Sequence, residues 1–229
     1  IGAAVAAARR AGIANVSLDL IFALPEALGR DLAADLDRAL ALEPDHISLY
    51  GLTVEDGTPL GRQVADGRAL AAPEARYEEE YLAVVRRLTA DGYQFYEVSN
   101  AARPGFEAVH NQAYWRSAPY IGLGPSAHSF DGATRWWNEA AYSRWLSRVE
   151  AGESPVAGRE ILRPEQQRLE ALYLGLRTAD GIAMPEPPGG PMAAAVAGWV
   201  SAGWADVADG RLCLTPRGWL RLDELAASL

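Results

Sequence analysis

The chain has 229 residues, 49% of them hydrophobic, which is enough to bury a core in one or two domains. Its formal net charge is −9, and its 21 basic residues are all arginines scattered along the sequence. This charge disfavours a phosphate backbone as ligand, so we expect no nucleic-acid partner. We expect no membrane span either, because no apolar run approaches the roughly 18 to 20 residues required. The single cysteine, Cys213, excludes an internal disulfide framework and fits a reducing compartment, the cytoplasm.

Strand-like and helix-like segments alternate through the first hundred residues. Apolar runs at 16–22, 46–52 and 94–99 predict strands, which we expect to be buried on both faces, as in parallel sheets. Between them, apolar residues recur at helical spacing over 31–42 and 73–91. The repeated strand–helix unit predicts an α/β fold, either a barrel or a doubly wound sheet. Both folds bind ligands at the carboxyl ends of their strands.

Polar residues lie within or directly after these strands. Asp19 interrupts an apolar strand, where an unpaired carboxylate would cost several kcal/mol, so we expect it to have a partner. A ligand group and an arginine of the next unit are equally compatible with the sequence. Thr53 and Glu55 follow the second strand, and Glu97 and Asn100 end the third. We expect these polar side chains to lie together at the carboxyl ends of the strands, around the opening of one ligand site. Any single one of them could instead be a residue that caps a loop.

Two of the three histidines lie in segments rich in aromatic residues and glycine. Residues 110–115 read His-Asn-Gln-Ala-Tyr-Trp, and a glycine-rich loop at 120–129 contains His128. An imidazole binds iron or carries a proton, and flat aromatic side chains cover planar ligands. The preceding stretch, 103–109, predicts an irregular loop, where histidines are often exposed and free to ligate. A hydrogen-bonded structural histidine is the competing interpretation, and we prefer it for His46.

Several blocks of the chain resemble one protein family. The blocks are Ser17–Phe22 with Leu24–Pro25, His46–Tyr50, Tyr96–Asn100, His110–Trp115 and Gly122–Ser129. In this order they resemble the radical SAM proteins related to oxygen-independent coproporphyrinogen III oxidase, and more narrowly the HemW-type haem chaperones. The His-Asn-x-x-Tyr-Trp block is typical of the chaperone branch, and the oxidases proper lack it.

The resemblance implies a task and a haem site. Members of the chaperone branch bind haem and hand it to haem-requiring acceptor proteins. By resemblance, His110 is the axial ligand of the haem iron. The haem-site residues implied in this way are His110, Asn111, Tyr114 and Trp115.

The resemblance also implies an S-adenosylmethionine site. By resemblance, Asp19 matches the aspartate that contacts the ribose of the cofactor, and Thr53 matches a position that contacts the cofactor through its backbone. His128 lies in the loop that closes over the cofactor. Family members hold a 4Fe–4S cluster through an N-terminal Cys-x-x-x-Cys-x-x-Cys motif. This chain has only Cys213 and begins with Ile1 in a helix-like segment. We therefore interpret it as the C-terminal part of a longer protein, unable to build the cluster alone.

The pattern changes after Gly132, which predicts a second unit. We expect residues 1–132 to form the C-terminal half of a radical SAM barrel, and 133–229 a small helical, winged-helix-like α+β domain. The elements expected there are helices at 139–150, 163–177, 192–202 and from Pro216 to the end, a loop at 184–191, and a hairpin with an Asp209–Gly210 corner. Acidic residues match the arginines of this wing, which disfavours DNA binding. The resemblance to the radical SAM family implies that the unit is a lid or a partner-docking module.

Three functions are compatible with these observations. The first is a haem chaperone that delivers haem to acceptor haemoproteins, with a possible homodimer. The alternative is an oxidoreductase that catalyses the radical decarboxylation of coproporphyrinogen. The third is a non-catalytic interaction or regulatory module built on the winged helix. The block at 110–115 favours the first function over the second.

Overall fold

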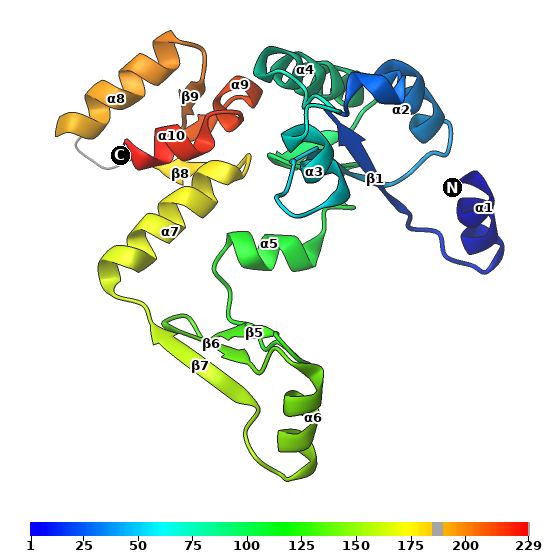
Figure 1. Cartoon of the computed structure of the whole chain (residues 1–229). Coiled ribbons are helices and arrows are strands. Elements are labelled where there is room, and N and C mark those ends of the chain that lie inside the picture. The colour runs from blue at the N-terminus through cyan, green and yellow to red at the C-terminus, as the bar shows by residue number, and fades with distance from the viewer. Residues whose placement is uncertain (185–189, 229) are drawn as a thin grey trace.

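The structure, a computed structural model, describes residues 1–184 and 190–228, with the backbone alone at residues 190 and 191. The chain forms an upper body around a four-stranded sheet, a C-terminal body beside it, and a lower arm that extends away from both (Figure 1). Within the described part of the chain, no helix is both long and apolar enough to cross a bilayer.

The upper body contains the predicted alternation of strands and helices. Its elements are α1 (Gly2–Arg10), β1 (Ser17–Phe22), η1 (Glu26–Leu28), α2 (Leu32–Leu40), β2 (His46–Gly51), α3 (Pro59–Ala65), α4 (Glu74–Ala90), β3 (Gln94–Glu97) and β4 (Asn100–Ala102). Strands β1 and β2 are parallel, as expected. The third predicted strand is shorter than expected, because the chain turns back after Glu97 and β4 inserts antiparallel between β2 and β3. The sheet is therefore mixed, and Asn100 begins a strand instead of ending one.

Helices α2 and α4 cover one face of this sheet. The Asp31 side chain caps α2 by accepting hydrogen bonds from the amides of Ala33 and Ala34, at 2.9 and 3.2 Å. Apolar residues of both helices pack on the strands and form the core. Its fully buried members include Ile47, Val84, Leu88, Tyr93 and Ala101.

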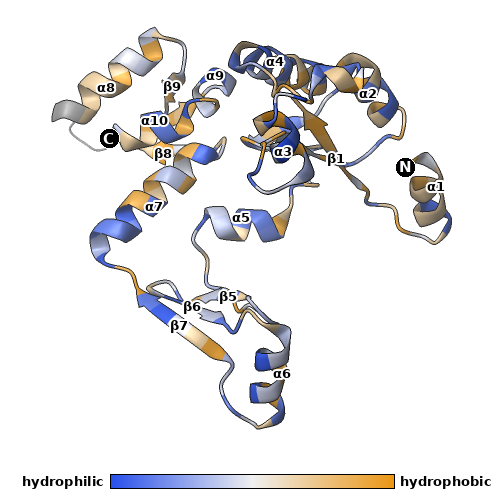
Figure 2. Ribbon diagram, in the orientation of Figure 1, coloured by the Kyte–Doolittle hydropathy of each residue, from blue (hydrophilic) through white to orange (hydrophobic). Residues whose placement is uncertain are grey.

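The opposite face of β1 is open, which corrects the expectation of strands buried on both faces. Exposure alternates along β1, with Ser17, Asp19 and Ile21 on the exposed side. The strand is largely hydrophobic in Figure 2, yet it lies at the end of the sheet order, and its outer edge pairs with no strand of the described residues. The Asp19 carboxylate is therefore exposed, contrary to our expectation of a buried charge. No arginine of the described residues pairs with it, so a ligand group remains the candidate partner.

The C-terminal body has the expected winged-helix-like order. It comprises α7 (Pro164–Arg177), β8 (Ile182–Ala183), α8 (Gly190–Ser201), β9 (Ala205–Ala208), β10 (Arg211–Leu214), α9 (Pro216–Trp219) and α10 (Leu222–Ala227). The predicted hairpin turns at Asp209 and Gly210, whose φ angles of 50° and 71° match the favoured Asp-Gly corner. The single terminal helix that we expected is split into α9 and α10. Of the expected loop at 184–191, residues 185–189 lie outside the described residues.

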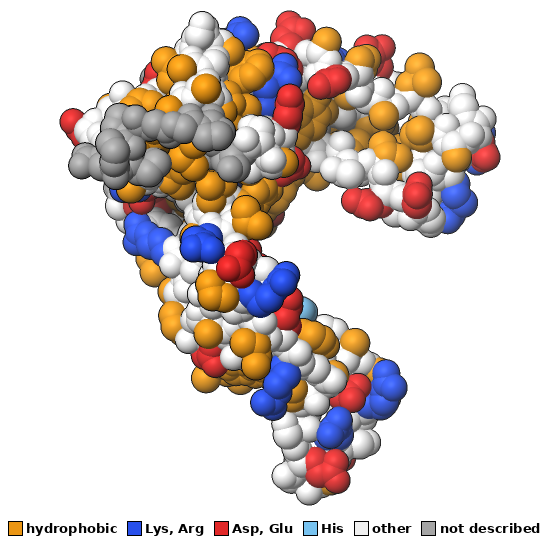
Figure 3. All heavy atoms as spheres, turned by 90° about the vertical axis from the view of Figure 1, so that its left-hand side faces the viewer, with side chains coloured by type: hydrophobic (Ala, Val, Ile, Leu, Met, Phe, Trp, Pro, Cys, Tyr) orange, Lys and Arg blue, Asp and Glu red, His pale blue; other side chains and the backbone are white. Residues whose placement is uncertain are grey.

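The lower arm differs most from the prediction. We expected a glycine-rich loop at 120–129 and a helix at 139–150, with no strand before the helix at 163–177. Instead, β5 (His128–Phe130), β6 (Thr134–Asn138) and β7 (Val156–Ile161) form an antiparallel sheet beside α6 (Tyr142–Glu150). The boundary expected at residue 132 falls in the turn between β5 and β6. On the face drawn in Figure 3, arginine and acidic side chains alternate along the arm and form no uniformly basic surface.

Candidate functional site

Helix α5 (Val109–Trp115) carries the aromatic and histidine segment and lies between the upper body and the lower arm (Figure 1). The irregular loop expected through Val109 ends earlier, so His110 lies in the first turn of a helix. Its side chain is exposed, as expected. Residues four apart share one side of a helix. His110 and Tyr114 therefore form one stripe of α5, and Asn111 and Trp115 form the next.

The stripe of Asn111 and Trp115 fastens α5 to the rest of the protein. The Trp115 ring lies 4.4 Å from the guanidinium carbon of Arg177, which ends α7. Burial raises the pKa of the Tyr96 phenol, whereas the Ala108 amide and the Asn111 side chain beside it lower that pKa. Asn111 thus contacts β3, and Trp115 contacts α7.

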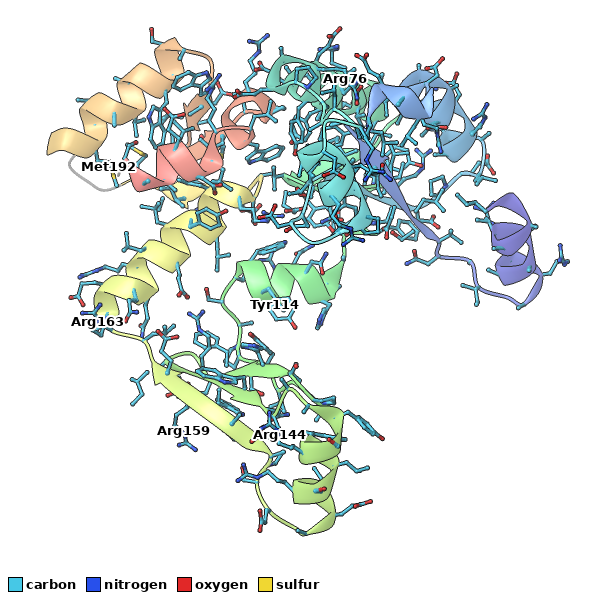
Figure 4. All side chains as sticks on the ribbon, viewed as in Figure 1. Arg76, Tyr114, Arg144, Arg159, Arg163 and Met192 are labelled. Carbon is cyan, nitrogen blue, oxygen red and sulfur yellow. The ribbon has the colours of Figure 1, made fainter. Side chains whose placement is uncertain are left out.

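The stripe of His110 and Tyr114 is directed away from these anchors. The two rings meet edge to face, with centroids 4.8 Å apart at 84°. Tyr114 points from α5 toward the lower arm in Figure 4, and its ring meets that of Tyr120 at 4.7 Å and 77°. An exposed imidazole beside an aromatic surface fits the ligand chemistry of haem iron.

A buried histidine connects the open face of the sheet with the start of α5. His46 lies between the Ser17 hydroxyl and the Tyr96 hydroxyl, each 2.8 Å from a ring nitrogen, and Tyr96 also accepts a hydrogen bond from the Ala108 amide at 3.3 Å. Burial lowers the pKa of His46, and the charge of Asp19 opposes that change. These contacts agree with the structural role that we prefer for His46.

The proposed S-adenosylmethionine contacts are divided between two bodies. Asp19 begins a polar row across the open face of the sheet, since it pairs in register with Ser48, which pairs with Asn100. Thr53 is exposed just beyond β2, at the carboxyl edge of the same sheet. His128 instead belongs to β5 in the lower arm, where its ring stacks on Trp137 at 5.9 Å and 29°. The structure therefore does not bring His128 beside Asp19 or Thr53.

Glu97 lies inside the protein, where it pairs with a residue that sequence reasoning missed. Its fully buried carboxylate lies 2.8 Å from Arg177 and accepts hydrogen bonds from the Ser99 amide and the Asn100 side chain, at 2.8 and 2.5 Å. Burial raises the pKa of Glu97, and Arg177 is the largest of the influences that lower it. The carboxylate is thus a structural ion-pair partner. A polar residue in a strand signals a partner, but nothing in the local sequence identifies Arg177.

The chain does not fit a 4Fe–4S cluster. Such clusters are held by several thiolates, and the one cysteine, Cys213, lies half-buried on β10, where burial raises the pKa of its thiol. In the described part of the chain, no group of three histidine, cysteine or acidic side chains is arranged to hold a metal ion.

Comparison with known proteins identifies the class first. No family model matches the chain. A solved structure of the radical SAM enzyme coproporphyrinogen III oxidase (HemN) from Escherichia coli superposes with a TM-score of 0.75 at 18% identity, and the match covers 99% of this chain and 57% of that one. The fold is therefore that of a portion of the radical SAM proteins related to coproporphyrinogen oxidase.

Sequence relatives identify the family within this class. The chain is 36% identical over 231 residues to the haem chaperone HemW of Mycobacterium tuberculosis, which covers 100% of this chain and 59% of that protein. It is 34% identical over 175 residues to HemW of Bacillus subtilis, and 35% identical over 188 residues to the mitochondrial radical S-adenosyl methionine domain-containing protein 1 of Danio rerio. These matches cover 76% and 78% of this chain, and 46% and 42% of those proteins. The chain is therefore similar, over its whole length in the first of these matches, to the HemW-type radical SAM proteins, and it spans about half the length of these relatives.

Proposed function

We propose that this protein binds haem through His110 and passes it to a haem-requiring acceptor protein. The observation that carries the proposal is the exposed imidazole of His110 on a helix whose neighbouring stripe is anchored by Arg177 and Tyr96. The bacterial relatives, which are named haem chaperones, support it. A neutral imidazole nitrogen is a good iron ligand.

The exposure of His110 also suits the transfer step. An acceptor can approach an exposed axial ligand, and its own ligand can replace the imidazole at the iron. Tyr114 supplies an aromatic surface beside the bound ring system. Asn111 and Trp115 keep the helix fixed during the exchange, because they contact the upper body and α7 and not the imidazole.

Substitution of His110 tests the proposal. We expect His110→Ala to abolish the absorption band of histidine-ligated haem and to weaken haem binding, leaving residual association through Tyr114. Acidification should have the same effect on the unsubstituted protein, because protonation removes the lone pair that binds iron. The matched control is Gln112→Ala on the same helix, which should keep the band. Unchanged haem spectra and affinity in His110→Ala would show that the axial-ligand role is wrong.

We infer that the S-adenosylmethionine contacts of the intact protein include Asp19, Thr53 and His128. Asp19 and Thr53 are accessible at one sheet, whereas a contact from His128 requires the lower arm to approach that sheet. Loss of a charged hydrogen-bond partner in Asp19→Asn should weaken cofactor binding by roughly 1 to 3 kcal/mol. Because Asp19 is exposed, the melting temperature should stay nearly constant. A stability loss with unchanged affinity, measured by titration and thermal melts, would refute the ribose contact.

The second candidate function is that of an oxidoreductase. The structural neighbour supports it, since that protein is named a coproporphyrinogen III oxidase and radical SAM enzyme. The reaction would decarboxylate propionate side chains with a 4Fe–4S cluster and S-adenosylmethionine. The His-Asn-x-x-Tyr-Trp block at 110–115 favours the chaperone over this oxidase. An assay of the intact protein for coproporphyrinogen decarboxylation separates the two functions, and we expect none.

We further infer a cytoplasmic setting, a homodimeric state, and the absence of a nucleic-acid partner. The single cysteine supports a reducing compartment. The net charge of −9 argues against phosphate backbones. The outer edge of β1, which pairs with no strand among the described residues, leaves backbone groups available for association between copies of this chain.

A further inference from the structure

A cavity of about 660 Å³ lies beside Tyr114, between the end of α5, strands β5 and β6, and helices α7 and α10. Its size falls within the roughly 300 to 1,000 Å³ that are usual for small-molecule sites. The lining residues that matter here are Tyr114, Tyr120, Phe130, Arg135, Glu170 and Tyr173. Three separate segments of the chain therefore meet around one hollow.

One wall of the cavity is a row of aromatic rings. Tyr114 meets Tyr120 edge to face at 4.7 Å, and Tyr120 lies 6.4 Å from Phe130 with a 46° tilt. Tyr114 in turn contacts His110, so the row extends from the imidazole into the cavity. Aromatic walls of this kind favour a flat, apolar ligand.

The polar groups of the cavity favour a ligand with a carboxylate. Arg135 forms an ion pair with Glu170, and their side chains are 31% and 42% exposed. A guanidinium has five donors, and a partly exposed pair can exchange its carboxylate for another at little cost. The Asp223 carboxylate is already engaged, because the Tyr173 hydroxyl donates to it at 2.8 Å. Arg135 is thus the basic residue lining the cavity that can bind an anionic group of a ligand.

We propose that this cavity binds a flat, carboxylate-bearing ring system of the porphyrin class, with the ring against Tyr120 and Phe130 and a carboxylate on Arg135. The choice of a porphyrin among flat carboxylates rests on the proposed haem function. The site itself rests on the aromatic wall, the volume and the guanidinium.

Metal-free protoporphyrin IX is the probe, because its binding does not depend on an iron ligand. In a fluorescence titration of the intact protein, Arg135→Gln should raise its Kd about tenfold, the usual effect of losing one charge-assisted hydrogen bond. Glu170→Gln removes the competing carboxylate and should lower the Kd. A purely structural ion pair would not give these opposite signs. Arg144→Gln is the control, since Arg144 is 72% exposed on α6, away from the cavity.

A cavity-filling substitution completes the test. Ala226 lines the cavity from α10, and Ala226→Trp should block the probe. Unchanged Kd values in both Arg135→Gln and Ala226→Trp, with folding verified by circular dichroism, would overturn the cavity proposal. The haem band of His110 reports iron ligation and not this cavity, so either proposal can fail while the other stands.

Discussion

Single residues of the 110–115 segment have different roles because of where each one points. The resemblance assigned four of them to a haem site together. In the helix, Trp115 lies over Arg177 and Asn111 lies beside Tyr96, whereas His110 is exposed with Tyr114 next to it. The amide and the indole therefore hold the helix, the imidazole is exposed, and the phenol ring packs against Tyr120 of the lower arm.

His46 predicts a pH dependence of stability. Burial lowers its pKa in the folded chain below the ordinary value near 6.5, which the unfolded chain retains. The unfolded chain therefore binds more protons below about pH 6.5. The contribution of the neutral, buried ring is complete above that pH and is lost as the pH falls toward the folded pKa. Urea unfolding between pH 7.5 and 5 should show this loss.

The His46→Gln variant provides the comparison. It should be less stable than the unsubstituted protein at pH 7.5, because the hydrogen bonds of the imidazole ring with Ser17 and Tyr96 are lost or altered. Its stability should nevertheless fall less steeply between pH 7 and 5. All other ionisable groups are common to both proteins, so their contributions cancel in the comparison. Parallel pH profiles would contradict a buried, neutral His46.

Helix α5 is held by a contact that is distant in the chain. Arg177, at the end of α7, contacts Trp115 of α5 and Glu97 of β3 at the same time. One guanidinium therefore joins the helix of the haem proposal, the sheet and the C-terminal body. The Val98 amide also donates to the Arg177 carbonyl at 3.1 Å, which closes the same junction through the backbone.

Removal of the charge at this junction should be costly. Arg177→Met keeps an aliphatic stem against Trp115 but leaves the fully buried carboxylate of Glu97 without its cation. We expect a loss of about 3 to 5 kcal/mol in the free energy of unfolding. Combining Arg177→Met with Glu97→Gln should recover part of the loss, because no buried charge is then unpaired. Chemical denaturation of the single and double variants measures both effects.

The control for this junction lies on the same helix. Arg168 is 75% exposed and pairs with Glu165 at 3.4 Å on the surface. Arg168→Met should therefore change stability by less than about 0.5 kcal/mol. If Arg177→Met were equally mild, Arg177 would not hold the elements together.

Considered as one body, the chain presents an open edge. The outer edge of β1 lacks a strand partner among the described residues, and a groove of about 880 Å³ runs along it, lined by Leu18, Ile21 and Leu28 among others. Ile21 and Leu28 are 48% and 60% exposed. Unpaired strand edges beside apolar surface promote association between chains.

We therefore expect the isolated 229-residue polypeptide to self-associate. Sedimentation velocity should detect dimers or larger species at micromolar concentrations. Ile21→Lys should reduce this association, since a charge on an edge strand opposes pairing. Leu70→Lys is the control, because Leu70 is 80% exposed and lies between α3 and α4, outside the strands. A monodisperse monomer that unfolds cooperatively would contradict the prediction.

Local chemistry was enough to predict the elements whose signals lie within a few residues. Apolar spacing and flanking residues predicted α2, α4 and α7, and the Asp209–Gly210 corner predicted the β9–β10 hairpin. The sequence blocks also indicated the family. The irregular loop expected at 103–109 predicted that His110 is exposed, although His110 itself lies in α5. Contacts between segments that are distant in the chain could not be predicted from such local signals. The insertion of β4, the pairing of Glu97 with Arg177 and the division of α5 into two stripes depend on the path of the whole chain, because side chains far apart in sequence meet only after the strands and helices have packed.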